Sequence, residues 1–291
     1  MRGLAEFIMR GRWQALAVAV LGSGSLLFGW ISASAIALIT LRRGVSEGAW
    51  LTLWALLPAA LALWFSGDSG SILLLSGTYL LAVLLRESVS LPLAVAATVG
   101  VGFASGAILL SLSGEFLQQL VDIFNEVIAQ LESGLQAKSE ATISLQRPGV
   151  MQVAGMLAAG NSAMVVLALL LGRYWQASLY NPGGFRREFH ALRMPPQWTF
   201  ALAMLAVGLW LAFPAHGGWA AIAVVPLMFC GLALAHARAA VTGQGSGWLS
   251  ALYLLWLVLD PVKLALLGIV VIDAVLDFRS RWQNRYGADG D

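Results

Sequence analysis

Residues 88–114 read SVSLPLAVAATVGVGFASGAILLSLSG, and this run contains no charged side chain. A helix needs about 20 apolar residues to cross the hydrocarbon of a bilayer. Comparable apolar runs cover residues 13–41, 48–67, 69–85, 148–172 and 194–237, and a last run, 247–276, is interrupted by three charged residues. The sequence therefore predicts an all-α, polytopic transmembrane helix bundle that occupies residues 1–291 as a single membrane domain.

The composition agrees with this prediction. Of the 291 residues, 59% are hydrophobic and 11% are charged, whereas soluble domains have about 25% charged residues. One soluble core of this size could not bury so much apolar surface. The excess must contact lipid, so the bilayer is the first expected partner.

The long runs 13–41 and 247–276 are each either one tilted helix or a pair of short helices. The positive-inside rule separates these alternatives, because cytoplasmic loops are rich in Lys and Arg. If both runs are helix pairs and the N-terminus is cytoplasmic, 14 of the 17 basic residues lie in the cytoplasm: Arg2, Arg10, Arg12, Arg42, Arg43, Arg86, Arg173, Arg186, Arg187, Arg193, Arg238, Arg279, Arg281 and Arg285. We therefore expect about eight to ten membrane segments, with ten favoured and both termini cytoplasmic.

Residues 113–148 form the one long polar stretch. Apolar residues recur there at helical spacing, from Phe116 and Leu120 through Phe124 to Leu131 and Leu135. The stretch is acidic, which suits the non-cytoplasmic side, and Ser113 is a candidate N-cap. It predicts an amphipathic helix outside the membrane core, either packed over the ends of the spans, lying on the membrane surface or covering an entrance.

Motifs for enzymatic chemistry are missing from the chain. It has no Walker pattern, no GxGxxG after a strand, no HExxH and no correctly spaced GxSxG. The three histidines are scattered, and the single cysteine, Cys230, lies in an apolar run typical of a buried residue. We expect no enzyme, no cofactor, no metal site and no nucleic-acid partner.

Ionisable residues at membrane depth are costly and are by default candidates for function. Asp260 and Lys263 are three residues apart across Pro261, and either cap an external turn or line a site. Asp273 and Asp277 share a helix face, on which Asp277 could instead pair with Arg281. Asn161 is a polar side chain that either lines a cavity or bridges two helices. The five ligand or gate candidates are therefore Asn161, Asp260, Lys263, Asp273 and Asp277.

Two further segments are candidates for contact with lipid or protein partners. Residues 174–196 form a basic connector with Arg186, Arg187 and Arg193, interrupted by the turn sequence Asn-Pro-Gly-Gly at 181–184. It suits either anionic headgroups or a cytoplasmic partner. Ala15 and Ala19 form a small-xxx-small pair, which permits close helix contact and could serve a membrane partner.

The C-terminal pattern, Gly268, then Asp273, then Asp277-Phe278-Arg279, resembles the closing signature of the YybS-like family of bacterial multi-pass membrane proteins of unknown function. Leu41-Arg42-Arg43-Gly44 and Leu192-Arg193-Met194-Pro195 are also similar to that family, whereas 113–148 is not matched. The family is similar in architecture to the substrate-binding S-components of energy-coupling-factor transporters. The resemblance implies a bacterial inner-membrane location, a small-molecule pocket that opens outward and a cytoplasmic partner that hydrolyses ATP.

Two functions remain open at this point. The leading expectation is a small-molecule-binding or transport-related membrane subunit. The alternative is a scaffold or assembly factor that recruits cytoplasmic proteins through 174–196 and the C-terminal tail. A binding subunit should contain a polar-lined cavity that reaches the outer face, whereas a scaffold should be tightly packed and conspicuous on its cytoplasmic side.

Overall fold

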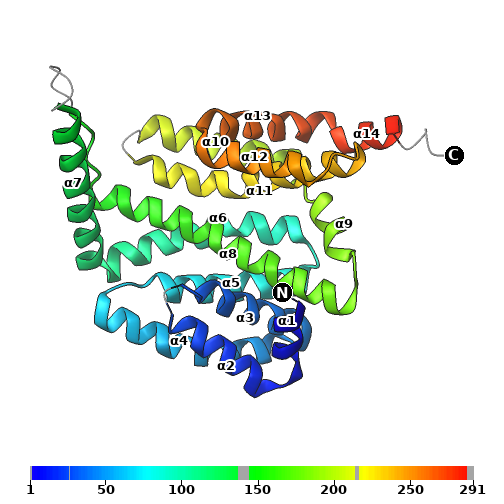
Figure 1. Ribbon diagram of the computed structural model, residues 1–291, viewed down its shortest axis with the longest axis horizontal. Coiled ribbons are helices and arrows are strands. Elements are labelled where there is room, and N and C mark those ends of the chain that lie inside the picture. The colour runs from blue at the N-terminus through cyan, green and yellow to red at the C-terminus, as the bar shows by residue number, and fades with distance from the viewer. Residues whose placement is uncertain (1, 26, 137–143, 214–215, 287–291) are drawn as a thin grey trace.

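The computed structural model describes residues 2–25, 27–136, 144–213 and 216–286. Within these residues the chain forms helices and short connections, without strands (Figure 1). The helices are α1 (Arg2–Arg10), α2 (Arg12–Ser23), α3 (Gly29–Arg43), α4 (Val45–Ser66), α5 (Gly70–Ser88), α6 (Leu91–Leu112), α7 (Gly114–Gln136), α8 (Val150–Tyr180), α9 (Gly184–His190), α10 (Pro196–Ala212), α11 (Gly217–Val241), α12 (Ser246–Val258), α13 (Asp260–Leu276) and α14 (Phe278–Tyr286).

Five helices are long and apolar enough to cross a membrane, namely α4, α5, α6, α8 and α11. The pair α12 and α13 passes the same test together and is bent by 113° at its break, and α10 is a shorter apolar helix. The run 13–41 is divided between α2 and α3, which pack against each other. The expectation of an all-α fold with several apolar helices is thus confirmed, and five of the expected eight to ten membrane segments are long enough to span alone.

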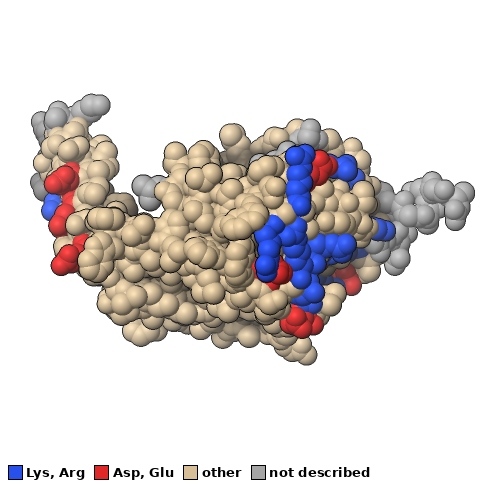
Figure 2. All heavy atoms as spheres, turned by 90° about the horizontal axis from the view of Figure 1, so that it is seen from below, with Lys and Arg blue, Asp and Glu red and all other residues tan. Residues whose placement is uncertain are grey.

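The bundle has two chemically different ends. Arg42 and Arg43 close α3, Arg86 lies in the last turn of α5 and Arg238 in that of α11. Figure 2 shows Lys and Arg side chains gathered toward one end of the molecule, and Asp and Glu side chains over α7 at the opposite end. We call them the basic end and the acidic end. Arg43 donates a hydrogen bond to the Met9 carbonyl at 2.7 Å, so α1 also lies at the basic end.

Small residues let the central helices approach one another. Residues 32–41 of α3 are all buried. Gly172 of α8 faces them so closely that an added Cβ would lie 2.6 Å from the Cβ of Ala37. In lipid, where apolar side chains gain little from leaving the solvent, such close backbone contact is a main source of helix association. The helix α8 packs against α3, α6 and α11 and therefore connects the N-terminal helices with the C-terminal ones (Figure 1).

The helix α7 runs across the acidic end, roughly at right angles to the long helices (Figure 1). Leu117 and Val121 in its first half are buried against α8. The expected amphipathic helix in 113–148 is present as Gly114–Gln136, while residues 137–143 of that stretch lie outside the described residues. Ser113, the expected N-cap, instead pairs its hydroxyl with that of Ser69 at 2.8 Å.

Candidate functional site

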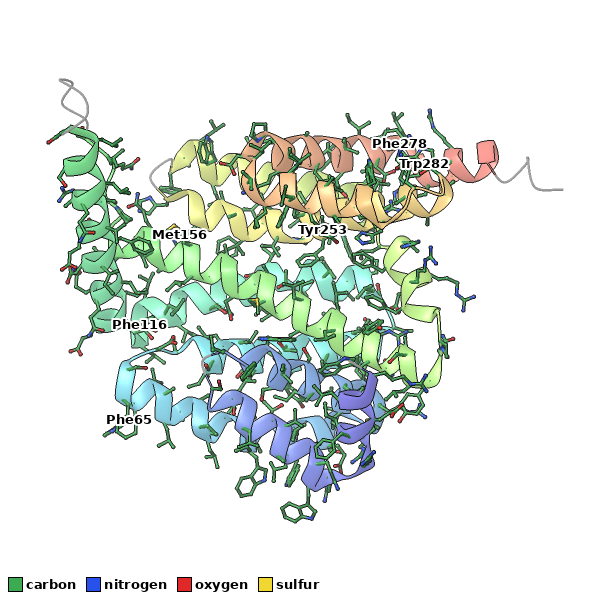
Figure 3. All side chains as sticks on the ribbon, in the orientation of Figure 1. Phe65, Phe116, Met156, Tyr253, Phe278 and Trp282 are labelled. Carbon is green, nitrogen blue, oxygen red and sulfur yellow. The ribbon has the colours of Figure 1, made fainter. Side chains whose placement is uncertain are left out.

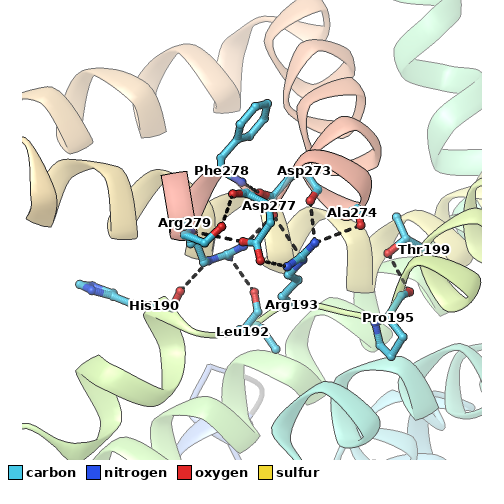
Figure 4. A network of polar contacts seen from close by, with 11 residues as sticks. His190, Leu192, Arg193, Pro195, Thr199, Asp273, Ala274, Asp277, Phe278 and Arg279 are labelled. Carbon is cyan, nitrogen blue, oxygen red and sulfur yellow. Dashed lines mark hydrogen bonds and ion pairs between the residues drawn. The ribbon is translucent and has the colours of Figure 1, made fainter. Parts of the chain in front are cut away.

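The last helix break brings four charged side chains together at the basic end (Figure 4). The helix α13 ends at Leu276, and Asp277 adopts a left-handed backbone conformation with φ of 47°. The Asp273 carboxylate then accepts two bonds, one from the Phe278 amide at 2.8 Å and one from Arg279 at 2.7 Å. This carboxylate is therefore the cap that fixes the turn between α13 and α14.

The connector before α10 is bound to the same cluster. Arg279 also donates to the carbonyls of His190 and Leu192, at 2.8 and 2.9 Å. Arg193 donates to the carbonyl of Asp273 at 2.9 Å and forms an ion pair with Asp277 at 2.8 Å. The four charges thus join the end of α9, the start of α10 and the end of α13, and we call them the C-terminal cluster: Arg193, Asp273, Asp277 and Arg279.

Burial and the neighbouring charges act in opposite directions on the C-terminal cluster. Burial lowers the pKa of the Arg279 guanidinium, and the neighbouring Asp273 acts in the opposite direction. Burial tends to raise the pKa of Asp277, but the Ser280 amide and Arg193 outweigh it, so the pKa is lowered. The Ser280 amide and Arg193 therefore favour the ionised form of the Asp277 carboxyl group.

Three residues of the C-terminal cluster were candidates from the sequence, namely Asp273, Asp277 and Arg193. Asp273 is 3% exposed, and both of its carboxylate oxygens accept bonds from the chain itself. Asp277 pairs with Arg193 rather than with Arg281. In the described structure the two aspartates and Arg193 hold elements together, and the geometry gives them a positioning role.

Asn161 bridges two helices in the interior. It donates to the Ser105 hydroxyl of α6 at 3.1 Å. One residue along, the Ser162 carbonyl accepts a bond from Thr98 at 3.4 Å. Asn161 therefore bridges α8 and α6, which is one of the two alternatives that the sequence left open.

Ala15 and Ala19 are buried, at 2% and 0% exposure, by the chain's own helices. The hydroxyl of Ser32 in α3 bonds to the Ala19 carbonyl. This small-residue face of α2 is consequently used inside the bundle and is not accessible to a partner. Arg186 and Arg187, in contrast, are exposed on α9 at the basic end.

Within the described residues, α10, α11 and α13 enclose a groove with a volume of about 810 Å³. Its lining is almost entirely apolar, with Trp210 from α10, Met228 from α11 and Gly268 from α13. Lys263 and Asp260 line one end and form an ion pair at 2.8 Å. We call it the α10–α13 groove. The charged pair was expected from the sequence, but the apolar walls were not, because they come from three separate helices.

A smaller cavity of about 440 Å³ lies at the basic end and is more polar. Arg86, Glu87, Arg173, Gln176 and Glu188 contribute to its walls. Arg173 is bound by Glu188 at 2.8 Å and by Gln176 at 2.7 Å. Of these two cavities, the polar one is thus at the basic end and the larger one is apolar.

No family model, curated protein or solved structure matches this chain. Within the described residues, no group of three or more His, Cys, Asp or Glu side chains is placed to hold a metal ion. The chemistry of the molecule must therefore be argued from its cavities and its charges.

Proposed function

We propose that this protein binds an amphiphile, a molecule with a hydrocarbon chain and a polar end, in the α10–α13 groove. One observation carries the proposal: this wide groove is lined almost entirely by apolar side chains and ends at the Asp260–Lys263 ion pair. Its volume of about 810 Å³ falls in the range of about 300–1,000 Å³ for ligand pockets. This narrows the expected small-molecule ligand to a lipid-like class.

The walls of the groove favour a hydrocarbon chain over a polar solute. A polar group that enters an apolar site without hydrogen-bond partners costs about 1–3 kcal/mol in proteins. Trp210, Met228 and Leu264 offer no charge to such a group. At the end of the groove, Lys263 and Asp260 supply one charge of each sign, which suits a zwitterionic head.

The same proposal includes a finer topology. We infer ten membrane segments, namely α2 to α6, α8 and α10 to α13, of which five are long enough to span alone and α12 and α13 meet at a bend of 113°. We infer that the basic end is cytoplasmic, in accord with the positive-inside rule, in a bacterial inner membrane. The Asp260 end of the groove then faces outward, as expected for a transport-related subunit similar to S-components.

A matched pair of glycines tests this function. Gly268 lines the groove, and a Cβ added there meets no atom within 4 Å. Gly208 of α10 is equally open but does not line the groove. Gly268→Leu fills the groove, whereas Gly208→Leu adds the same side chain elsewhere. The probe is palmitoyl lysophosphatidylcholine, added to purified protein in a polyoxyethylene detergent and counted by native mass spectrometry.

We expect Gly268→Leu to weaken lysophosphatidylcholine binding about tenfold, because overpacking an occupied site costs about 1–3 kcal/mol. Gly208→Leu should bind like the unchanged protein. The proposal fails if both variants bind equally, or if the unchanged protein binds no more probe than detergent exchange alone produces.

The scaffold alternative has one observation in its favour. Arg186 and Arg187 are exposed on α9, where a cytoplasmic protein could reach them. If recruitment is the function, a photoreactive residue at position 182 should cross-link a partner protein. Arg186→Glu/Arg187→Glu should then abolish this cross-linking, while lysophosphatidylcholine binding stays unchanged.

A further inference from the structure

A second groove follows α11 toward the basic end. It lies between α11, α12, α13 and α14 and has a volume of about 500 Å³. Leu234, Leu252, Leu266 and Ile269 give it apolar walls. At Gly231 in this groove, an added Cβ would lie 2.6 Å from the Cγ of Leu266, so the glycine permits α13 to approach α11. The α11 and α13 walls of the groove therefore lie in close contact at Gly231.

A tryptophan closes this groove at the basic end. Trp282 stacks on Phe278 with 6.0 Å between ring centres, where α14 leaves α13 (Figure 3). The Arg238 guanidinium lies 5.2 Å from the centre of the Trp282 ring. Trp282 also lines a neighbouring cavity of about 320 Å³, together with Arg187 and His190. One indole therefore separates an apolar space from a basic one.

The arginines around Trp282 differ in their pairing. Arg279 is neutralised by Asp273 in the C-terminal cluster. Arg187 and Arg238 form no ion pair with any carboxylate of the described residues. Arg238 therefore lines the apolar groove, and Arg187 lines the cavity on the other side of Trp282. A negatively charged group beside Trp282 would complement both side chains.

The position of these groups selects the kind of anion. Basic pockets between helices at the end of a bundle bind anionic lipid headgroups, and indole rings prefer the membrane interface. Trp248, at the start of α12, lines the same groove as Trp282. An apolar groove, two indoles and two arginines that form no ion pair within the described residues together match one molecule that has both acyl chains and a negative head.

We infer that this groove binds an anionic phospholipid from the leaflet at the basic end, with its acyl chains along Leu252 and Ile269 and its phosphate between Arg187 and Arg238. The inference concerns a different groove and a different ligand from the proposed function, and it does not depend on it. The bound lipid would fasten α14 and the connector to the membrane surface.

The test is native mass spectrometry of the purified full-length protein after delipidation. The probes are dioleoylphosphatidylglycerol, dioleoylphosphatidylcholine and inorganic phosphate. The test variant is Arg187→Gln/Arg238→Gln, and the matched control is Arg10→Gln/Arg186→Gln, which removes the same charge from exposed arginines outside the groove.

We expect the test variant to bind phosphatidylglycerol about 30-fold more weakly. The variant loses two arginines, and each arginine near an anionic surface adds a similar share of the attraction. The control should keep its affinity, phosphatidylcholine should bind weakly to all forms, and millimolar phosphate should not displace the lipid. A separate variant, Ile269→Trp, should block the acyl chains while leaving both arginines in place, and should lose phosphatidylglycerol as well.

The inference is overturned if the control loses as much affinity as the test variant, because the effect would then come from net charge alone. It is also overturned if phosphatidylcholine binds as tightly as phosphatidylglycerol, if free phosphate competes fully, or if Ile269→Trp binds normally. Gly268→Leu, which fills the other groove, should leave phosphatidylglycerol binding intact and so separates the two sites.

Discussion

Replacing Asp273 with asparagine should strongly destabilise the protein while preserving the shape of the side chain. The Asp273 and Arg279 side chains are only 5% and 13% exposed, and their ion pair is 2.7 Å long. Breaking a buried pair by removing one partner costs about 3–5 kcal/mol, because the other charge is left uncompensated. Arg279 keeps its bonds to two carbonyl oxygens, so we expect the lower part of that range, about 3 kcal/mol.

The same helix offers a matched control. Asp260 and Lys263 form an ion pair of 2.8 Å at the other end of α13, with side chains 85% and 36% exposed. Exposed pairs contribute about 0.2–1 kcal/mol. Asp260→Asn should therefore lower the free energy of unfolding by less than about 1 kcal/mol. The assay is reversible unfolding in mixed micelles with increasing dodecyl sulfate, followed by circular dichroism.

A third variant separates loss of the pair from loss of a single charge. In Asp273→Asn/Arg279→Gln no uncompensated arginine remains, so part of the stability should return relative to Asp273→Asn alone. Equal losses for Asp273→Asn and Asp260→Asn would refute the reasoning, and so would a double variant that loses the sum of the two single effects.

Two further predictions concern packing and pH. An added Cβ at Gly218 would lie 2.5 Å from a backbone nitrogen of α8, so Gly218→Ala should cost about 2 kcal/mol of unfolding free energy. Gly100→Ala, with open space around it, should be neutral or stabilising by up to about 1 kcal/mol; comparable losses would contradict the packing argument. A backbone amide and Arg147 lower the pKa of Glu132 from its ordinary 4.5, so their contact persists above 4.5 and is lost as the pH falls through the lower value in the folded protein. A nitroxide on Gln146→Cys should gain mobility in that acid range, and in Glu132→Gln it should be mobile at every pH; a pH-dependent label in that variant would exclude Glu132 as the cause.

The helices could be predicted from the sequence because they depend on local features, namely apolar runs and turn residues. The run 88–114 contains α6, Leu91–Leu112, almost exactly at its apolar centre. The turn sequence at 181–184 ends α8 at Tyr180, and Gly183 adopts φ of 82°, which a glycine tolerates. The run 148–172 ended at Arg173, yet α8 continues beyond it, because Arg173 finds partners in Gln176 and Glu188.

The candidate site was harder to predict because its contacts are distant in sequence. Asp273 stood out as an ionisable residue in an apolar run, but its interaction with Arg193 crosses 80 residues. The expected Asp277–Arg281 pair assumed that one helix continues through both positions. The left-handed conformation of Asp277 interrupts that periodicity and turns its carboxylate toward Arg193. The apolar grooves likewise arise from residues that no local pattern connects.

The unequal lengths of the helices have a consequence for the surrounding bilayer. The helix α12 has 13 residues and α10 and α13 have 17 each, which correspond to about 20 Å and 26 Å at about 1.5 Å per residue. The hydrocarbon layer of a typical bilayer is about 30 Å thick. In the proposed topology, where α12 is a membrane segment of its own, the lipid beside α12 thins to match it, at a cost of a fraction of a kcal/mol per Å. The protein should accordingly partition into thinner, shorter-chain membranes, with the dent in the bilayer located on its C-terminal flank.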